Sequence, residues 1–189
     1  MSVVYMISDT HFGHKNICHY RKQFSSMEEH DQFILKNILD TVKKRDILWM
    51  LGDCFFQEHT IEYAKAISKK VQHLNFIPGN HDSDNTERLE LLKKMINMGL
   101  FHKVGSMFKI GGFWLTHPPI HPAELRGKPN IHGHVHFATV MHERRIEHSP
   151  FNIEFVTEPD PNYVNVCCEN VDYKPINFQL IKAGWRSYE

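Results

Sequence analysis

The stretch Ile47-Leu48-Trp49-Met50-Leu51-Gly52-Asp53 is an apolar run that ends abruptly in a glycine and an acidic residue. A short apolar run bounded by turn residues is typical of a strand buried on both faces of a sheet. The same pattern occurs at residues 3–7, before Ser8-Asp9, and at residues 74–77, before Pro78-Gly79. The sequence therefore predicts three buried strands, each followed by a polar loop.

Helices are predicted between these strands. Ser26 and Glu29 form the S-x-x-E pattern of a capping box, and apolar residues then recur at helical spacing to about Val42. Further helices are expected at about residues 60–70 and 87–98, with Gly99 as the C-terminal cap of the latter. The chain thus begins with the order βαβαβα.

The second half of the chain changes to hairpins. Residues 107–110 and 113–116 flank Gly111-Gly112, which predicts a β-hairpin with a two-glycine turn. Strand-like segments follow at residues 153–156, 164–167 and 176–181. The sequence contains no internal repeat and no linker, so we expect a single domain, residues 1–189, of the α/β (α+β) class. Its predicted architecture is a mixed two-sheet β-sandwich flanked by helices.

The composition excludes several functional classes. Lys+Arg and Asp+Glu are equal at 22 each, so no broad basic surface indicates binding to long nucleic acid or to an anionic membrane. No apolar stretch is long enough to span a bilayer, and the N-terminus lacks the basic region of a signal peptide. The four cysteines have no C-x-x-C spacing, which favours reduced thiols in a cytoplasmic protein. The 15 histidines indicate metal binding or proton transfer.

Residues that commonly bind metals follow the predicted strands in five places. These are Asp9-Thr10-His11, Gly52-Asp53, Gly79-Asn80-His81-Asp82, Thr116-His117 and Gly133-His134-Val135-His136. Because ligands collect at the carboxyl ends of strands in α/β sheets, five such loops predict one site.

The residue types favour a dinuclear metal centre at this site. Imidazole and carboxylate ligands suit divalent Mn, Fe, Zn, Ni or Co, and Mn is our first choice. One carboxylate, Asp53, can bridge two cations about 3.5–4 Å apart. Each motif taken alone has an ordinary explanation, such as a turn or a pair of surface histidines. Their occurrence together, each at a strand end, favours the metal site.

The order of these motifs resembles that of the calcineurin-like metallophosphoesterase superfamily, from Met6 to His136. Ser8-Asp9-Thr10-His11-Phe12-Gly13-His14, with the later Asn165-Val166 and Tyr173-Lys174-Pro175, resembles its small bacterial and phage single-domain members. The resemblance implies a four-layer fold with two sheets between helices, and a dinuclear centre of two divalent metal ions.

The resemblance also implies a role for each residue. Asp9, His11 and His136 would hold one metal; Asn80, His117 and His134 would hold the other; and Asp53 would bridge them. His81 would be a general acid for the leaving oxygen rather than a ligand, and Asn80 would also contact a phosphate oxygen.

The sequence departs from the protein-phosphatase members of that superfamily at one motif. They carry G-D-x-x-D-R-G, whereas the stretch here is Gly52-Asp53-Cys54-Phe55-Phe56-Gln57, with Phe56 in place of the Asp that steadies the catalytic histidine. We therefore do not expect a serine/threonine protein phosphatase. Asp82, Asp84 or a backbone carbonyl are the candidates to orient His81.

Several residues beside the ligand loops are candidate substrate contacts. They are His14, His121 and Arg126, and a surface or core-edge position is the alternative for each. We interpret Arg21-Lys22 as surface charge rather than as a phosphate contact. We interpret residues 142–148 as a solvated face, with a mobile flap over the cleft as the alternative.

The predicted function is hydrolysis of a small phosphodiester or phosphomonoester, nucleotides included, by attack of a metal-bridging hydroxide in a monomer or homodimer. One alternative is a nuclease acting on short nucleic acids; zero net charge argues against long DNA. The other is a non-catalytic binding scaffold of the same fold. Such a scaffold should lack at least one ligand, and this chain lacks none.

Overall fold

The apolar runs of the N-terminal half form neighbouring parallel strands, as expected. In the computed structural model, which describes residues 2–186, they are the centre of a five-stranded sheet with the order β11-β1-β2-β3-β4. Only the β1–β11 pair is antiparallel among these. The strands are β1 (Val4–Ile7), β2 (Ile47–Met50), β3 (His73–Phe76), β4 (Lys103–Val104) and β11 (Ile176–Asn177).

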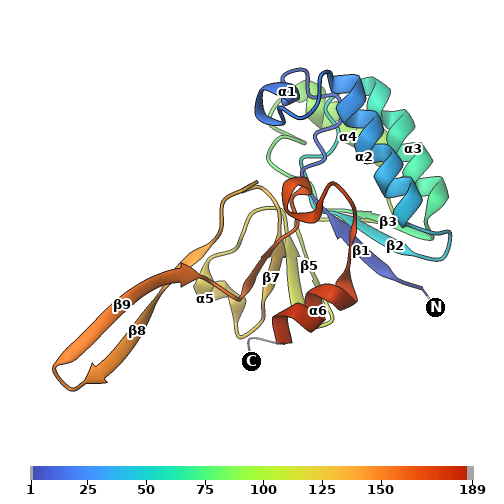
Figure 1. Ribbon diagram of the computed structural model, residues 1–189. Helices are drawn as coiled ribbons and strands as arrows, with labels where there is room; N and C mark the ends of the chain where they lie inside the picture. The colour runs from blue at the N-terminus through green and yellow to red at the C-terminus, as the bar shows by residue number, and fades with distance from the viewer. Residues whose placement is uncertain (1, 187–189) are drawn as a thin grey trace.

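Three helices cover one face of this sheet (Figure 1). They are α2 (Met27–Thr41), α3 (Ile61–Lys70), preceded by the short 3-10 helix η1 (Glu58–Thr60), and α4 (Thr86–Asn97). Ser26 caps α2 by accepting from the backbone N–H of Glu29 at 3.1 Å. The Glu29 carboxylate accepts from the backbone N–H of Ser25, so the return bond of the predicted capping box lies one residue earlier. Gly99 follows α4 with a φ of +68°, as predicted for its cap.

A four-stranded sheet packs against the other face of the first sheet. Its order is β10-β7-β6-β5, and the predicted hairpin provides its antiparallel pair. Met6 and Trp49 from the first sheet share a buried cluster with Leu115 and Ile131 from the second. The strands are β5 (Met107–Ile110), β6 (Phe113–Thr116), β7 (Asn130–His132) and β10 (Tyr163–Asn165). The protein therefore has a mixed α/β fold with two packed sheets.

The end of the chain corrects one prediction. Residues 176–181 were expected to be a strand, but β11 ends at Asn177 and α6 (Phe178–Arg186) follows at once. The Asn177 side chain accepts from the backbone N–H of Gln179 at 2.8 Å, which favours a helix start over a continued strand. Phe178, Ile181 and Trp185, spaced three and four apart, then pack on the core between the sheets.

The charged run at residues 142–148 forms a strand of a separate ribbon. It lies in β8 (Met141–Ser149), which pairs antiparallel with β9 (Asn152–Pro159). Figure 1 shows this ribbon projecting away from both sheets. The solvated-face interpretation therefore holds, and the flap interpretation is wrong.

Strand pairing continues from the sheets into the ligand loops. The backbone N–H of Asp9 donates to the carbonyl of Gly52, and that of His11 donates to the carbonyl of Asp53, both at 3.0 Å. In the second sheet, the N–H of Gly133 donates to the carbonyl of His117 at 2.8 Å. Ser8 and Cys167 form a parallel bridge that joins the two sheets at the same end. The five predicted loops therefore converge.

The remaining elements are short. They are α1 (Ile17–Tyr20), α5 (Pro122–Leu125) and the 3-10 helix η2 (Cys168–Val171). All four cysteines lie in the described residues and none is in a disulfide, in agreement with the expectation of reduced thiols. Among residues 2–186, no helix combines the length and apolar character needed to cross a membrane.

The packing of the two sheets predicts the effect of a core truncation. Leu115→Ala should lower the free energy of unfolding by about 2–5 kcal/mol, because the fully buried side chain leaves a cavity between the sheets. Leu180→Ala is the matched control, since the same side chain is 64% exposed on α6 and its loss should cost under about 1 kcal/mol. Chemical denaturation measures both, and equal losses would contradict the two-sheet core.

Candidate metal centre

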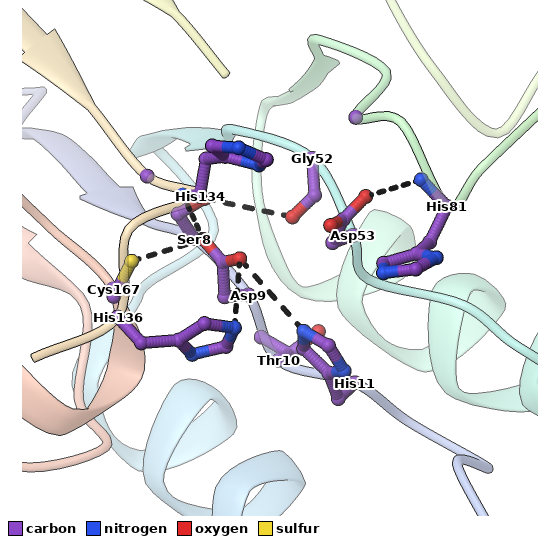
Figure 2. A network of polar contacts seen from close by, with 12 residues as sticks. Ser8, Asp9, Thr10, His11, Gly52, Asp53, His81, His134, His136 and Cys167 are labelled. Carbon is purple, nitrogen blue, oxygen red and sulfur yellow. Dashed lines mark hydrogen bonds and ion pairs between the residues drawn. The ribbon is translucent and has the colours of Figure 1, made fainter. Parts of the chain in front are cut away.

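The seven predicted metal ligands gather in one cluster at the converging strand ends. Donor atoms of Asp9, His11 and Asp53 lie within 4.8 Å of one another, as do those of Asp53, His117 and His134. His136 lies beside Asp9, and Asn80 contacts His117, so both belong to the same cluster. Figure 2 shows Asp9 facing both His11 and His136, with Asp53 beside His81.

Asp9 is the centre of one half of the cluster. Its Oδ2 accepts from the backbone N–H of His134 at 2.9 Å and from the thiol of Cys167 at 3.1 Å. Its Oδ1 has no hydrogen-bond partner and lies 3.8 Å from His11 Nε2 and 3.9 Å from His136 Nε2. Burial opposes the charge on Asp9, but the adjacent His11 ring and the field of His117 hold the pKa of the carboxyl below its usual range.

His11 and His136 present nitrogens to this oxygen in different ways. His11 is 6% exposed and stacks on Phe56, and neither ring nitrogen has a hydrogen-bond partner. Burial lowers the pKa of His11 to about 4, so the ring is neutral at pH 7. His136 donates from Nδ1 to Glu169 Oε1 at 3.1 Å, which leaves Nε2 directed at Asp9. Carboxylate–histidine pairs of this kind orient metal ligands.

Glu169 belongs to a buried polar network that sequence reasoning missed. Arg21 donates to Glu169 through Nε at 2.9 Å and to the backbone carbonyl of Asp9 at 2.6 Å. Its other guanidinium nitrogen contacts His30, which pairs with Asp31 at 2.8 Å. Arg21 is 1% exposed, so its interpretation as surface charge is wrong. An arginine fixed in this way braces the loop that carries Asp9.

His117 and Asp53 are the centre of the other half. His117 donates from Nδ1 to the carbonyl of Leu51 at 2.7 Å, because a carbonyl can only accept. Its Nε2 then lies 3.2 Å from Asp53 Oδ2 and 3.1 Å from Asn80 Oδ1. Burial disfavours a charged ring, but Asp53 raises the pKa of His117 to about 9. Asp53 thus favours a positive charge between His117 Nε2, Asp53 Oδ2 and Asn80 Oδ1.

The donor atoms fit divalent cations. Two metal–ligand bonds of about 2.1 Å that meet at a right angle place their ligand atoms about 3 Å apart. The distances from His117 Nε2 to the Asp53 and Asn80 oxygens are close to this value. Asp9 Oδ1 and both His11 nitrogens are buried without hydrogen-bond partners, which is costly unless another group satisfies them. Asp53 belongs to both groups of donors, as the bridging ligand of a dinuclear centre would.

Two glycines confirm that the backbone crowds this centre. A Cβ on Gly79 would lie 2.7 Å from the backbone nitrogen of Asp53 and closer still to its carboxylate. A Cβ on Gly133 would lie 2.7 Å from Ser8 Cβ and would overlap the Asp9 carboxylate. Only glycine allows these approaches.

Five of the seven predicted ligands have left-handed backbone conformations. Their φ angles are +56° at Asp9, +51° at His11, +51° at Asp53, +71° at His134 and +49° at His136. Such conformations cost non-glycine residues on the order of 1–3 kcal/mol each and cluster at functional sites. The backbone is therefore strained at five of the seven positions that present a donor to the cluster.

Asp82 ties two of the ligand loops together. Its buried carboxylate accepts from the backbone N–H groups of Asp53 at 2.8 Å, Gly79 at 2.7 Å and Cys54 at 3.3 Å. These bonds fix the end of β2 against the end of β3. Asp82 therefore positions Asp53 and is not the partner of the His81 side chain.

The partner of His81 is Asp84. His81 Nδ1 lies 2.9 Å from Asp84 Oδ2, while the backbone N–H of His81 donates to Asp53 Oδ1 at 2.8 Å. Of the three candidates for orienting His81, the structure selects Asp84. The ring centroid of His81 lies 6.2 Å from that of His11, beside the cluster.

The predicted substrate contacts divide into two groups. His14 borders the centre, with its ring centroid 5.5 Å from that of His11. His121 caps α5 by accepting from the backbone N–H of Ala123, and Arg126 pairs with Glu124 on the surface. The contacts of His121 and Arg126 are therefore within their own loop.

Some residues that contact the cluster carried no usable sequence signal. Cys167 contacts Asp9 from a segment that resembles an ordinary strand, and burial raises the pKa of its thiol, so it donates as a neutral group. Glu169 and Arg21 lie 148 residues apart and show no shared motif. Asp84 was one of three candidates, and sequence spacing did not distinguish among them.

Comparison with known proteins finds similarity over nearly the whole chain. No family model matches the sequence. The chain is similar to the uncharacterized protein MJ1445 of Methanocaldococcus jannaschii, with 28% identity over 184 residues, 96% of this chain and 90% of that protein. It is similar to the Gene 66 protein of Mycobacterium phage L5, with 29% identity over 179 residues, 77% of this chain and 85% of that protein.

A solved structure shares the fold. The crystal structure of AQ665, a protein of unknown function from Aquifex aeolicus, superposes with a TM-score of 0.65 at 26% sequence identity. The match covers 97% of this chain and 99% of that one. The fold described here is therefore similar to an experimentally determined one over nearly all of the chain.

Proposed function

We propose that this chain is a dinuclear-metal phosphoesterase of the calcineurin-like type, acting on small phosphodiesters or phosphomonoesters. The observation that carries the proposal is the cluster of seven donors around two joined half-sites, with buried oxygen and nitrogen atoms that have no protein partner. Asp9, His11 and His136 would hold one ion, Asn80, His117 and His134 the other, and Asp53 both. Two such ions would stabilise charge on a phosphoryl group and provide hydroxide from water at neutral pH.

The fold is compatible with the proposed four-layer arrangement. Helices α2, α3 and α4 form an outer layer over the first sheet. On the outer side of the second sheet, Trp114 donates through Nε1 to the carbonyl of Leu125 in α5 at 3.0 Å. In this proposal α5 is a reduced form of the fourth layer.

The residues around the donors have separate tasks in the proposed reaction. The Asn80 side chain contacts His117 and is exposed, so it can also donate to a phosphate oxygen. His81 has Nδ1 occupied by Asp84, which leaves Nε2 to deliver a proton to the departing oxygen. The Asp84 carboxylate would orient the imidazole for that transfer. In the protein-phosphatase members, the second Asp of G-D-x-x-D-R-G steadies the catalytic histidine from another loop. In this proposal Asp84 does so for His81.

A non-catalytic scaffold is a weaker interpretation of the same geometry. A scaffold has no need for strained ligand conformations or for unpartnered buried donors, because both lower stability. All seven donors are present and gathered. The first experiment is therefore a test of metal-dependent turnover.

Metal removal should abolish activity. Turnover of bis(4-nitrophenyl) phosphate should vanish in chelated protein and return with Mn²⁺, Co²⁺ or Ni²⁺ better than with Mg²⁺, because nitrogen donors favour the transition metals. Initial rates after each metal addition measure this. Full activity in thoroughly chelated protein would contradict the proposal.

Glu169 should control the affinity of only one ion. Glu169→Gln removes the charge that orients His136, and loss of such a partner typically weakens metal binding by about 10–100-fold. Calorimetric titration with Mn²⁺ should show one weakened site and one unchanged site. Glu154→Gln is the matched control, since Glu154 contacts His148 at 2.9 Å on the remote ribbon. Equal behaviour of the two variants would rule out the role of Glu169.

The His81–Asp84 pair should matter most for poor leaving groups. His81→Ala should lower kcat by about 10²–10⁴ on a ribose or alkyl ester and much less on a nitrophenyl ester, because nitrophenolate leaves without a proton. Asp84→Asn should show the same selectivity with a smaller loss, and both variants should keep two metals.

The control for this pair is Asp40→Asn, which alters an exposed ion pair with Lys36 on α2. It should leave kcat unchanged on both esters. If His81→Ala loses a metal, or slows both esters equally, the assignment of His81 as the acid is wrong.

A further inference from the structure

A cleft beside the candidate metal centre has an aromatic rim. The cleft has a volume of about 420 Å³ and is lined by the ligands His11 and His136 together with His81. Tyr20 and Phe137 also line it, and we call these two side chains the aromatic rim. The volume lies in the range of small-molecule sites.

Both side chains of the aromatic rim are exposed to solvent. Tyr20 is 75% exposed and Phe137 is 71% exposed, although both line the same cleft. A single exposed aromatic residue on a surface needs no explanation. Two in the lining of one cleft, together with candidate ligands, place exposed apolar planar surface beside the proposed metal centre.

The backbone beneath Phe137 is fixed. Asn165 donates to the carbonyls of His136 at 2.7 Å and Ala138 at 3.2 Å, one on each side of Phe137. Asn170 donates to the His136 carbonyl as well, also at 2.7 Å. Phe137 is therefore presented from a braced segment.

The backbone beneath Tyr20 is fixed in the same way. The next residue, Arg21, is buried and bonded to Glu169 and to the carbonyls of Asp9 and Thr10. Its backbone N–H also donates to the carbonyl of Ile17 at 2.8 Å, which closes α1. Rings presented from a fixed backbone lose less ordering entropy on binding than rings on a mobile loop.

We propose that the aromatic rim binds a planar ring carried by the substrate, so that Tyr20 and Phe137 select esters of ring-bearing groups such as nucleosides. This inference rests on the proposed function, because it places the phosphoryl group of the same molecule at the metal centre. Stacking on an aromatic side chain tolerates any base, since every base has a π-face. The rim thus selects a chemical class rather than one nucleotide.

A second cavity on the other side of His14 is the competing location for the ring. It has a volume of about 530 Å³, and its lining includes Lys15, Asn16 and Arg88. Arg88 lies over Phe56 at 3.9 Å from the ring centroid, so this aromatic face is already covered. The second cavity therefore suits a polar group better than a planar ring.

Paired ligands that differ only in the base test the proposal. Adenosine 5′-monophosphate and ribose 5-phosphate should be titrated calorimetrically into Mn²⁺-loaded protein. Adenosine 5′-monophosphate should bind more tightly, and Tyr20→Ala or Phe137→Ala should weaken it by about 5–150-fold, the range of single stacking contacts. Ribose 5-phosphate should bind all proteins alike. Phenyl phosphate, tested in parallel, shows whether any planar ring suffices or a nucleobase is required.

Two control variants make the result specific. Phe151→Ala removes a fully exposed aromatic side chain at the ribbon turn and should change nothing. Arg88→Ala probes the second cavity. If the wild type binds both phosphates equally, or if only Arg88→Ala removes the preference for the base, the rim is not the ring site.

Turnover separates this inference from the proposed function. Hydrolysis of bis(4-nitrophenyl) phosphate by the same Mn²⁺-loaded wild type reports on the phosphoesterase alone. Absent hydrolysis with a rim-dependent preference for adenosine 5′-monophosphate would overturn the function and keep the ring site. Normal hydrolysis without that preference would overturn the ring site and keep the function.

Discussion

The arrangement of the site depends on the contacts of one buried carboxylate, that of Asp9. One oxygen is satisfied by His134 and Cys167, and the other has no hydrogen-bond partner and faces two imidazoles. Arg21 braces this residue from behind through the Asp9 carbonyl, and Glu169 links the same guanidinium to His136. Strands from both sheets must end at this point for the contacts to form. The fold must therefore bring these strand ends together for the donor atoms to meet.

Much of the fold and of the donor cluster could be predicted from the sequence, because local rules decide them. Apolar runs stopped by Gly52-Asp53 or Pro78-Gly79 are strands of a buried sheet in the structure, and loops at their carboxyl ends meet as parallel pairing requires. The hairpin around Gly111-Gly112 was predictable because its own turn residues specify it. These signals lie within a few residues of the element that they specify.

The remaining features depend on contacts between distant parts of the chain. Arg21 and Glu169 lie 148 residues apart, so nothing near Arg21 indicated that it would be buried. Residues 176–181 have enough apolar and β-branched character for a strand, yet Asn177 starts a helix and the core between the sheets stabilises it. Asp82 is engaged by the backbone N–H groups of Asp53 and Gly79, which leaves Asp84 to contact the His81 side chain. Tertiary contacts decided all three, and the sequence pattern did not contain them.

The left-handed conformations of the predicted ligands have a consequence for how the sequence of such a protein would change over time. Glycine adopts these φ angles without strain, so replacing His134 or His136 by glycine would relax the backbone while removing a donor. A lineage selected for folding alone would find such replacements neutral or favourable and would lose the cluster one residue at a time. A chain that carries all seven donors therefore keeps five of them in strained conformations, at a cost in stability.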